Sequence, residues 1–205
     1  MFSMAIVGKI ALAGSSLMQL ALLRQTVITM DAALANDYRQ RVVSLSGTAI
    51  ALASLVVFFV WLFRSKKRLI AAGMAGAEYS PGFSVGCFFI PIVNLFLPFQ
   101  AVRELWRASQ CPTEWKSQSS SQIVGWWWAL WLLSAFVPLA GMLFQSLVEG
   151  REKMIVSTQV LIASAIVSIL SFLLTILFAR GVAKNSQGIG TKAEPGATDN
   201  PGDAQ

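Results

Sequence analysis

The chain has 205 residues, of which 55% are hydrophobic and only 13% are charged, about half the charged fraction of an ordinary soluble domain. This composition argues against a soluble protein and predicts an integral membrane protein. The net charge of +6 comes from basic residues at the ends of apolar runs, which indicates contact with a membrane surface and not with nucleic acid. Histidine is absent, and the two cysteines, Cys87 and Cys111, suggest neither a disulfide framework nor a metal or cofactor site.

Four apolar runs reach the roughly 20 residues that a transmembrane helix needs. They lie at about 4–23, 42–63, 123–144 and 155–179, whereas a fifth run, at 83–98, is shorter and broken by prolines. We therefore expect an all-α membrane protein with a single polytopic domain over residues 1–184. The last residues, 185–205, have almost no apolar side chains and are expected to form a disordered tail.

Basic residues set the expected orientation in the membrane. Arg64, Lys66, Lys67 and Arg68 follow the second span and mark the cytoplasmic side. If 83–98 returns to the side from which it enters, 11 of the 16 lysines and arginines lie inside, and the five outside are Arg24, Arg39, Arg41, Arg151 and Lys153. A full span at 83–98 would invert the later charges, so we favour a re-entrant or interfacial segment. Both termini are then cytoplasmic, and all seven tryptophans lie on or near the cytoplasmic face.

Small and polar residues form one-sided stripes on three of the spans. These stripes are Ser157, Ser164, Ser168, Ser171 and Thr175 on the fourth span, Ser44, Gly47, Ala51 and Ser54 on the second, and Gly8, Ala11, Ser15 and Gln19 on the first. They indicate helix packing within one bundle, with a polar pathway or a homodimer interface as alternatives. No span interior holds an acidic residue, and Lys9, near the end of its span, is expected to reach the surface.

The central segment 83–98 is preceded by Ser80, Pro81 and Gly82, which together are typical of a turn. Pro91 and Pro98 each lack a backbone donor and interrupt a helix. Asn94 lies nearly midway between these two prolines. Its side chain is expected to satisfy backbone groups freed by the breaks, or alternatively to line a binding site, as broken helices do in transporters.

Residues 99–109 are predicted to form an amphipathic helix on the cytoplasmic side. Phe99, Val102, Leu105 and Trp106 share its apolar face, and Gln100, Arg103, Glu104 and Arg107 share its polar face. Glu104 is expected to pair with Arg107 on the exposed side. Arg103 and Arg107 would face anionic headgroups, together with the basic cluster at 64–68. A surface helix without a ligand, or one that docks a protein, remains an alternative.

The central part of the chain resembles the bacterial membrane family catalogued as domain of unknown function 4328. The resemblance rests on Trp61 and Arg64, on 80–82, on the Pro-x-x-Asn-Leu-x-x-Pro pattern at 91–98, on Arg-Glu-Leu-Trp-Arg at 103–107 and on the tryptophan-rich 127–131. It covers roughly 42–178. Arg68 stands where the family tends to have asparagine, which strengthens the basic cluster. The resemblance implies an architecture in the bacterial inner membrane and no particular chemistry.

No catalytic constellation is evident, so the expected function is non-catalytic. The chain is predicted to bind anionic membrane lipids or to dock a protein partner, or a second copy of itself, at its cytoplasmic face. The residues proposed for binding are Arg64, Arg68, Asn94, Arg103, Trp106 and Arg107. The alternative is a small transporter or channel subunit with its site in 83–98.

Overall fold

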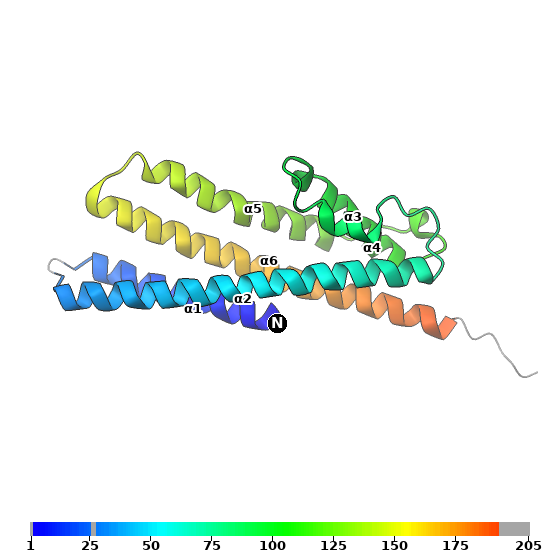
Figure 1. Cartoon of the computed structure of the whole chain (residues 1–205), viewed down its shortest axis with the longest axis horizontal. Helices are drawn as coiled ribbons and strands as arrows, with labels where there is room; N and C mark the ends of the chain where they lie inside the picture. The colour runs from blue at the N-terminus through cyan, green and yellow to red at the C-terminus, as the bar shows by residue number, and fades with distance from the viewer. Residues whose placement is uncertain (1, 26–27, 193–205) are drawn as a thin grey trace, which may run out of the picture.

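Four long helices dominate the fold (Figure 1). The computed structural model describes residues 2–25 and 28–192. The long helices are α1 (Phe2–Leu23), α2 (Met30–Ala71), α5 (Gln122–Gln145) and α6 (Gly150–Lys192). Each is long and apolar enough to cross a membrane. The chain is thus a multi-pass membrane protein with four candidate transmembrane helices, as predicted.

Two of these helices extend well beyond the spans predicted for them. The α2 helix has 42 residues, and at about 1.5 Å per residue it measures about 63 Å, roughly twice the hydrocarbon thickness of a bilayer. The connection between the first two predicted spans, 24–41, is thus helical over most of its length, because Thr29 caps a helix that begins at Met30. The α6 helix likewise continues to Lys192, so the predicted disordered tail is helical over 185–192. The rest of that tail lies outside the described residues.

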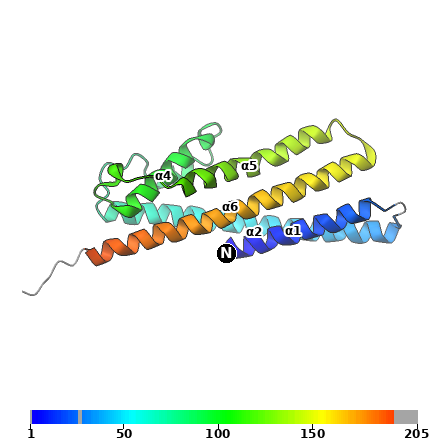
Figure 2. The ribbon, with the colours of Figure 1, turned by 180° about the vertical axis from the view of Figure 1, so that it is seen from behind.

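The α1 helix packs against both α2 and α6, and α5 packs against α6 (Figures 1 and 2). On α1, Gly8 allows close approach, since a Cβ there would lie 3.8 Å from the Gly47 Cα of α2. Nearer the α1–α2 connection, the Arg39 Nε donates to the Ser15 Oγ at 3.2 Å. The small-residue face predicted for the first span is thus a helix-packing face.

Between α2 and α5 the chain forms a helical hairpin. It consists of α3 (Pro81–Gly86), the 3₁₀ helix η1 (Val93–Leu95) and α4 (Leu97–Gln110), and a second 3₁₀ turn, η2 (Trp115–Ser117), follows. The hairpin packs beside the C-terminal part of α2 and the start of α5 (Figure 1). We call this end of the bundle the hairpin end, and the end with the α1–α2 and α5–α6 connections the far end.

The local chemistry of the hairpin differs from the predicted turn and break. Ser80 is the N-cap of α3, and its hydroxyl accepts a hydrogen bond from the Phe83 N–H at 3.1 Å, so Ser80, Pro81 and Gly82 begin a helix and do not form a turn. Pro98 similarly lies in the first turn of α4, where the missing N–H costs nothing. The chain reverses its direction between α3 and α4, in a segment that includes Ile92. The φ of Ile92 is 67°, which is unusual for a β-branched residue.

An aromatic core fills the hairpin end. Phe178 of α6 lies at its centre, with ring centroids 5.5 Å from Trp61, 5.8 Å from Trp106 and 6.2 Å from Trp127. The Trp127 indole donates to the Thr175 hydroxyl at 3.0 Å. The tryptophans gather at one end, as their spacing in the sequence suggested. Most of them pack the protein interior, however, and Trp126 is the strongly exposed exception, at 67%.

Candidate functional site

A buried ion pair anchors the hairpin to the bundle. The Lys66 Nζ of α2 lies 2.6 Å from the Glu104 Oε2 of α4, and the two side chains are 0% and 3% exposed. The other carboxylate oxygen accepts a hydrogen bond from the Glu78 N–H at 2.8 Å. One carboxylate therefore links the long α2 helix, the connection that precedes α3, and α4.

The expected surface pair of Glu104 with Arg107 is wrong. Glu104 shares a face with Ala101 and Ala108, which are buried, at helical spacings of 3 and 4, so it enters the core with them. Lys66 similarly lies between the buried Leu62 and Leu69 on α2. Sequence reasoning missed this pair, although both charges interrupt an apolar stripe at helical spacing, which is the signal that could have found it.

The other predicted residues of α4 contribute mainly to packing. Trp106 stacks on Phe178 and lies directly over Gly181, where an added Cβ would come within 2.6 Å of the indole ring. Arg103 is half-buried and lies over the Phe99 ring, 5.5 Å from its centroid. Arg107 is also half-buried, and its Nε has no hydrogen-bond partner among the described residues. The predicted range 99–109 is helical as part of α4, but α2, α5 and α6 cover much of this helix.

Asn94 does not supply the backbone partner expected of it. Its Oδ1 is buried without a hydrogen-bond partner in the described part of the chain. The carbonyl of the next residue, Leu95, instead accepts from the Trp128 indole N–H at 3.3 Å. The break in the hairpin is therefore supported by a tryptophan on α5, a long-range contact that the spacing around Asn94 did not indicate.

Arg64 and Arg68 lie one helical turn apart on an exposed face of α2. Both line a surface cavity of about 340 Å³ together with Trp61 and Ser65. Its apolar wall is formed by residues nearer the middle of α2, namely Val56, Val57 and Val60. Within residues 2–25 and 28–192, neither guanidinium has a hydrogen bond or an ion pair.

A second cavity, of about 490 Å³, continues from this one toward α6. Trp61, Ser65 and Arg68 line it from α2, and Val182 and Ser186 line it from α6. Arg64 and Arg68 do not form one surface with Arg103 and Arg107. Lys66 points at α4, and each of the two α2 arginines lies two residues away from it, a rotation of about 200° around the helix, so both point away from α4. The predicted binding residues thus fall into two groups, and only Arg64 and Arg68 are exposed, unpaired and beside a cavity.

In the described part of the chain, no group of three or more histidine, cysteine or acidic side chains could hold a metal ion. Of the two cysteines, Cys87 is buried and Cys111 is partly exposed. A hydrogen bond with the Thr113 side chain, followed by one with the backbone of Glu114, lowers the pKa of the Cys111 thiol.

Comparison with curated proteins and with solved structures gives no match. A comparison with protein-family models does give one. The model described as Domain of unknown function (DUF4328) matches residues 24–184, from the end of α1 through the whole hairpin and most of α6. Because that match spans well over half of the chain, the chain belongs to the DUF4328 family.

Proposed function

We propose that the protein is a non-catalytic membrane module that holds an anionic phospholipid against the hairpin end of α2. The observation that carries this proposal is the pair Arg64 and Arg68, unpaired and beside a cavity with an apolar wall. A guanidinium presents a planar set of donors that suits a phosphate, and two of them can bracket one headgroup. Trp61 and the valines below it would contact the upper part of the acyl chains.

Charge supports the same assignment. In the predicted orientation, the hairpin end faces the cytoplasmic leaflet, whose anionic lipids attract basic residues by about 1 kcal/mol each. Lys66 does not add to this attraction, because Glu104 neutralises it in the interior. Arg64 and Arg68 remain exposed on α2 beside the cavity. The binding face is therefore smaller than the sequence suggested, and it belongs to α2 and not to α4.

The hairpin is proposed to enter the membrane from this same side and return. Large apolar side chains project from its turn, with Phe89 69%, Ile92 76% and Phe96 62% exposed. Exposed apolar groups of this size are stable against lipid and costly against water. The same exposure weakens the alternative of a transporter site within 83–98, because these side chains point to the surface.

The proposal can be tested by measuring the lipids retained by the purified protein. The variant R64Q/R68Q should lose most of its bound anionic phospholipid relative to zwitterionic phospholipid when measured by mass spectrometry of the intact complex. K67Q/K184Q is the matched control, because it removes the same charge from exposed positions on α2 and α6 that line neither cavity. Equal anionic lipid on both variants would contradict a site at Arg64 and Arg68 and would favour a protein-docking face.

A further inference from the structure

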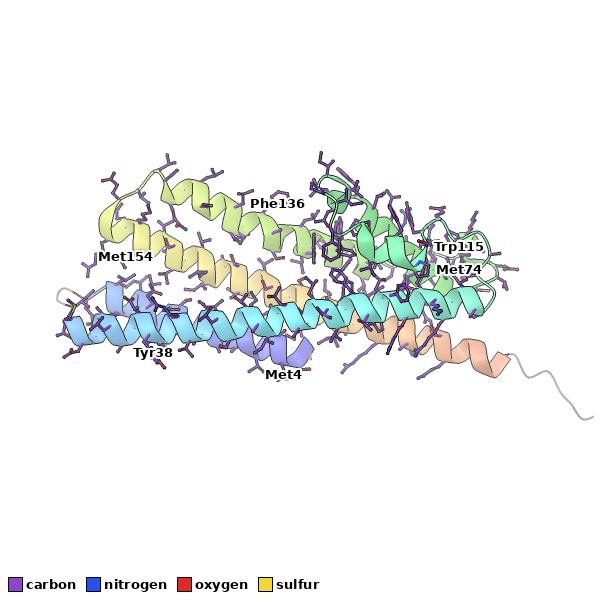
Figure 3. The ribbon with its side chains drawn as sticks, in the orientation of Figure 1. Met4, Tyr38, Met74, Trp115, Phe136 and Met154 are labelled. Carbon is purple, nitrogen blue, oxygen red and sulfur yellow. The ribbon has the colours of Figure 1, made fainter. Side chains whose placement is uncertain are left out.

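Lys9 lies deep in the bundle and not at its end. It lines one cavity with Ser134 of α5 and Ser168 of α6. These two serines lie near the middle of the apolar runs 123–144 and 155–179. Figure 3 shows why: Met4 of α1 lies at about the same position along the bundle as Phe136 of α5, so α1 begins beside the middle of α5. This position along the bundle argues against the expectation that Lys9 reaches the membrane surface.

Two cavities meet at this lysine. The first, of about 380 Å³, extends toward the hairpin end, where Ser54, Ser171 and Thr175 line it. The second, of about 500 Å³, extends toward the far end, where Ser44, Gln145 and Ser157 line it. Lys9 and Thr48 line both. The serine stripe predicted on the fourth span thus borders a space that runs along the bundle between α2 and the α5–α6 pair.

The charge of Lys9 has no counter-charge from the described chain. No aspartate or glutamate lines either cavity, and no hydrogen bond or ion pair joins Lys9 to a residue within 2–25 or 28–192. A lysine at mid-depth in a membrane protein is costly unless an anion or water accompanies it, and such residues mark binding sites and pathways. An anion from outside the chain would satisfy this position.

A second unsatisfied group lies on the same space. The Ser164 Oγ is buried and has no hydrogen-bond partner in the described residues, and Ser164 lines the second cavity beside Lys9. The remaining walls are largely apolar, with Leu52, Leu55 and Phe58 in the first cavity and Leu12, Val160 and Leu161 in the second. One cation, the unsatisfied hydroxyl of Ser164 and long apolar walls suit a ligand with one anionic end and an apolar chain.

We propose that this space binds a single-chain anionic amphiphile, such as a long-chain carboxylate, with its anionic group at Lys9 and its chain along the cavities. The site is separate from Arg64 and Arg68, neither of which lines these cavities. Its existence does not depend on phospholipid binding at the α2 surface. An amphiphile could enter sideways from the bilayer, because α2 approaches α5 and α6 closely over only a short part of its length.

The proposal is tested with radiolabelled oleate and the purified full chain in nanodiscs of neutral lipid. Saturable binding near one oleate per chain is expected. K9Q should weaken binding by at least about tenfold, whereas K9R, which keeps the charge, should stay within about threefold of the native protein. K67Q is the matched control, an exposed lysine remote from both cavities, and should bind as the native protein does.

Competition identifies which part of the ligand is recognised. Excess unlabelled oleate should displace the label, whereas oleyl alcohol, acetate and inorganic phosphate should not. Displacement by oleyl alcohol as effective as that by oleate would overturn the role of Lys9, and displacement by acetate or phosphate would replace the amphiphile with a small anion. If K9Q does not fold, S134F fills the first cavity while leaving Lys9 in place, and it should reduce oleate binding. Unchanged binding to S134F or to a folded K9Q would refute the site.

Discussion

The Lys66–Glu104 pair should dominate the stability of the hairpin end. The Lys66 Nζ and the Glu104 Oε2 are each other's only polar contact, since neither atom has a further hydrogen-bond partner within the described residues. Removing one partner leaves an unpaired charge in the interior, which typically costs about 3–5 kcal/mol. We expect K66M and E104Q each to lower the free energy of unfolding by about that amount. The amide in E104Q still offers an acceptor to the Glu78 N–H, so the loss of stability in this variant measures the removal of the negative charge.

The double variant K66M/E104Q distinguishes a stabilising buried ion pair from a contact that contributes nothing to stability. It removes both charges and keeps similar volumes, so its stability should return to within about 2 kcal/mol of the native protein. The measurement is reversible unfolding in bicelles with increasing denaturing detergent, followed by tryptophan fluorescence. E114Q changes an exposed carboxylate nearby and should shift the unfolding free energy by less than about 0.5 kcal/mol. Single-variant losses below about 1 kcal/mol, or a double variant as unstable as the sum of the singles, would show that Lys66 and Glu104 do not form a stabilising buried pair.

Three further predictions concern single positions. G181A should destabilise by about 1–3 kcal/mol because its Cβ would meet the Trp106 ring, whereas G14A, with open space around it, should be neutral or stabilising in the same unfolding assay. I92G should raise the unfolding free energy by about 1 kcal/mol because it relieves a positive φ, and a loss of stability would contradict that strain. Cys111 has a lowered pKa, so maleimide labelling should reach half its maximal rate at a lower pH than for a free cysteine peptide. A membrane-impermeant maleimide should label Cys111 only after cells are opened, and labelling of intact cells would contradict the predicted orientation.

The sequence was sufficient to predict the features that depend on composition and local spacing. Four apolar runs of spanning length gave four long helices, and the small-residue face around Gly8 became the contact with α2. Helix ends were predicted less well. Polar residues continue α2 and α6 beyond the apolar runs because no proline interrupts them there, and hydropathy detects only the apolar part of each helix.

Long-range pairing could not be derived from local patterns. Glu104 was assigned to a polar face because its polar neighbours suggested one, yet tertiary contact with Lys66 decided its environment. The depth of Lys9 also depended on how far α1 is displaced along α6, which no single helix reveals. Of the basic cluster predicted at 64–68, Arg64 and Arg68 are exposed whereas Lys66 is buried, and their separation from Arg103 depends on the orientation of α2 against α4.

Photo-crosslinking with an anionic lipid would show whether Arg64 and Arg68 hold a phospholipid headgroup. A phosphatidylglycerol analogue that carries a diazirine near its headgroup is incorporated into nanodiscs with the native protein, and the crosslinked residues are mapped by mass spectrometry. We expect crosslinks concentrated at 56–68 on α2, reduced strongly in R64Q/R68Q and unchanged in K67Q/K184Q. A matching phosphatidylcholine analogue should label this face weakly. Equal labelling by the two analogues, or crosslinks confined to the hairpin turn at 89–96, would contradict an anionic lipid site at Arg64 and Arg68.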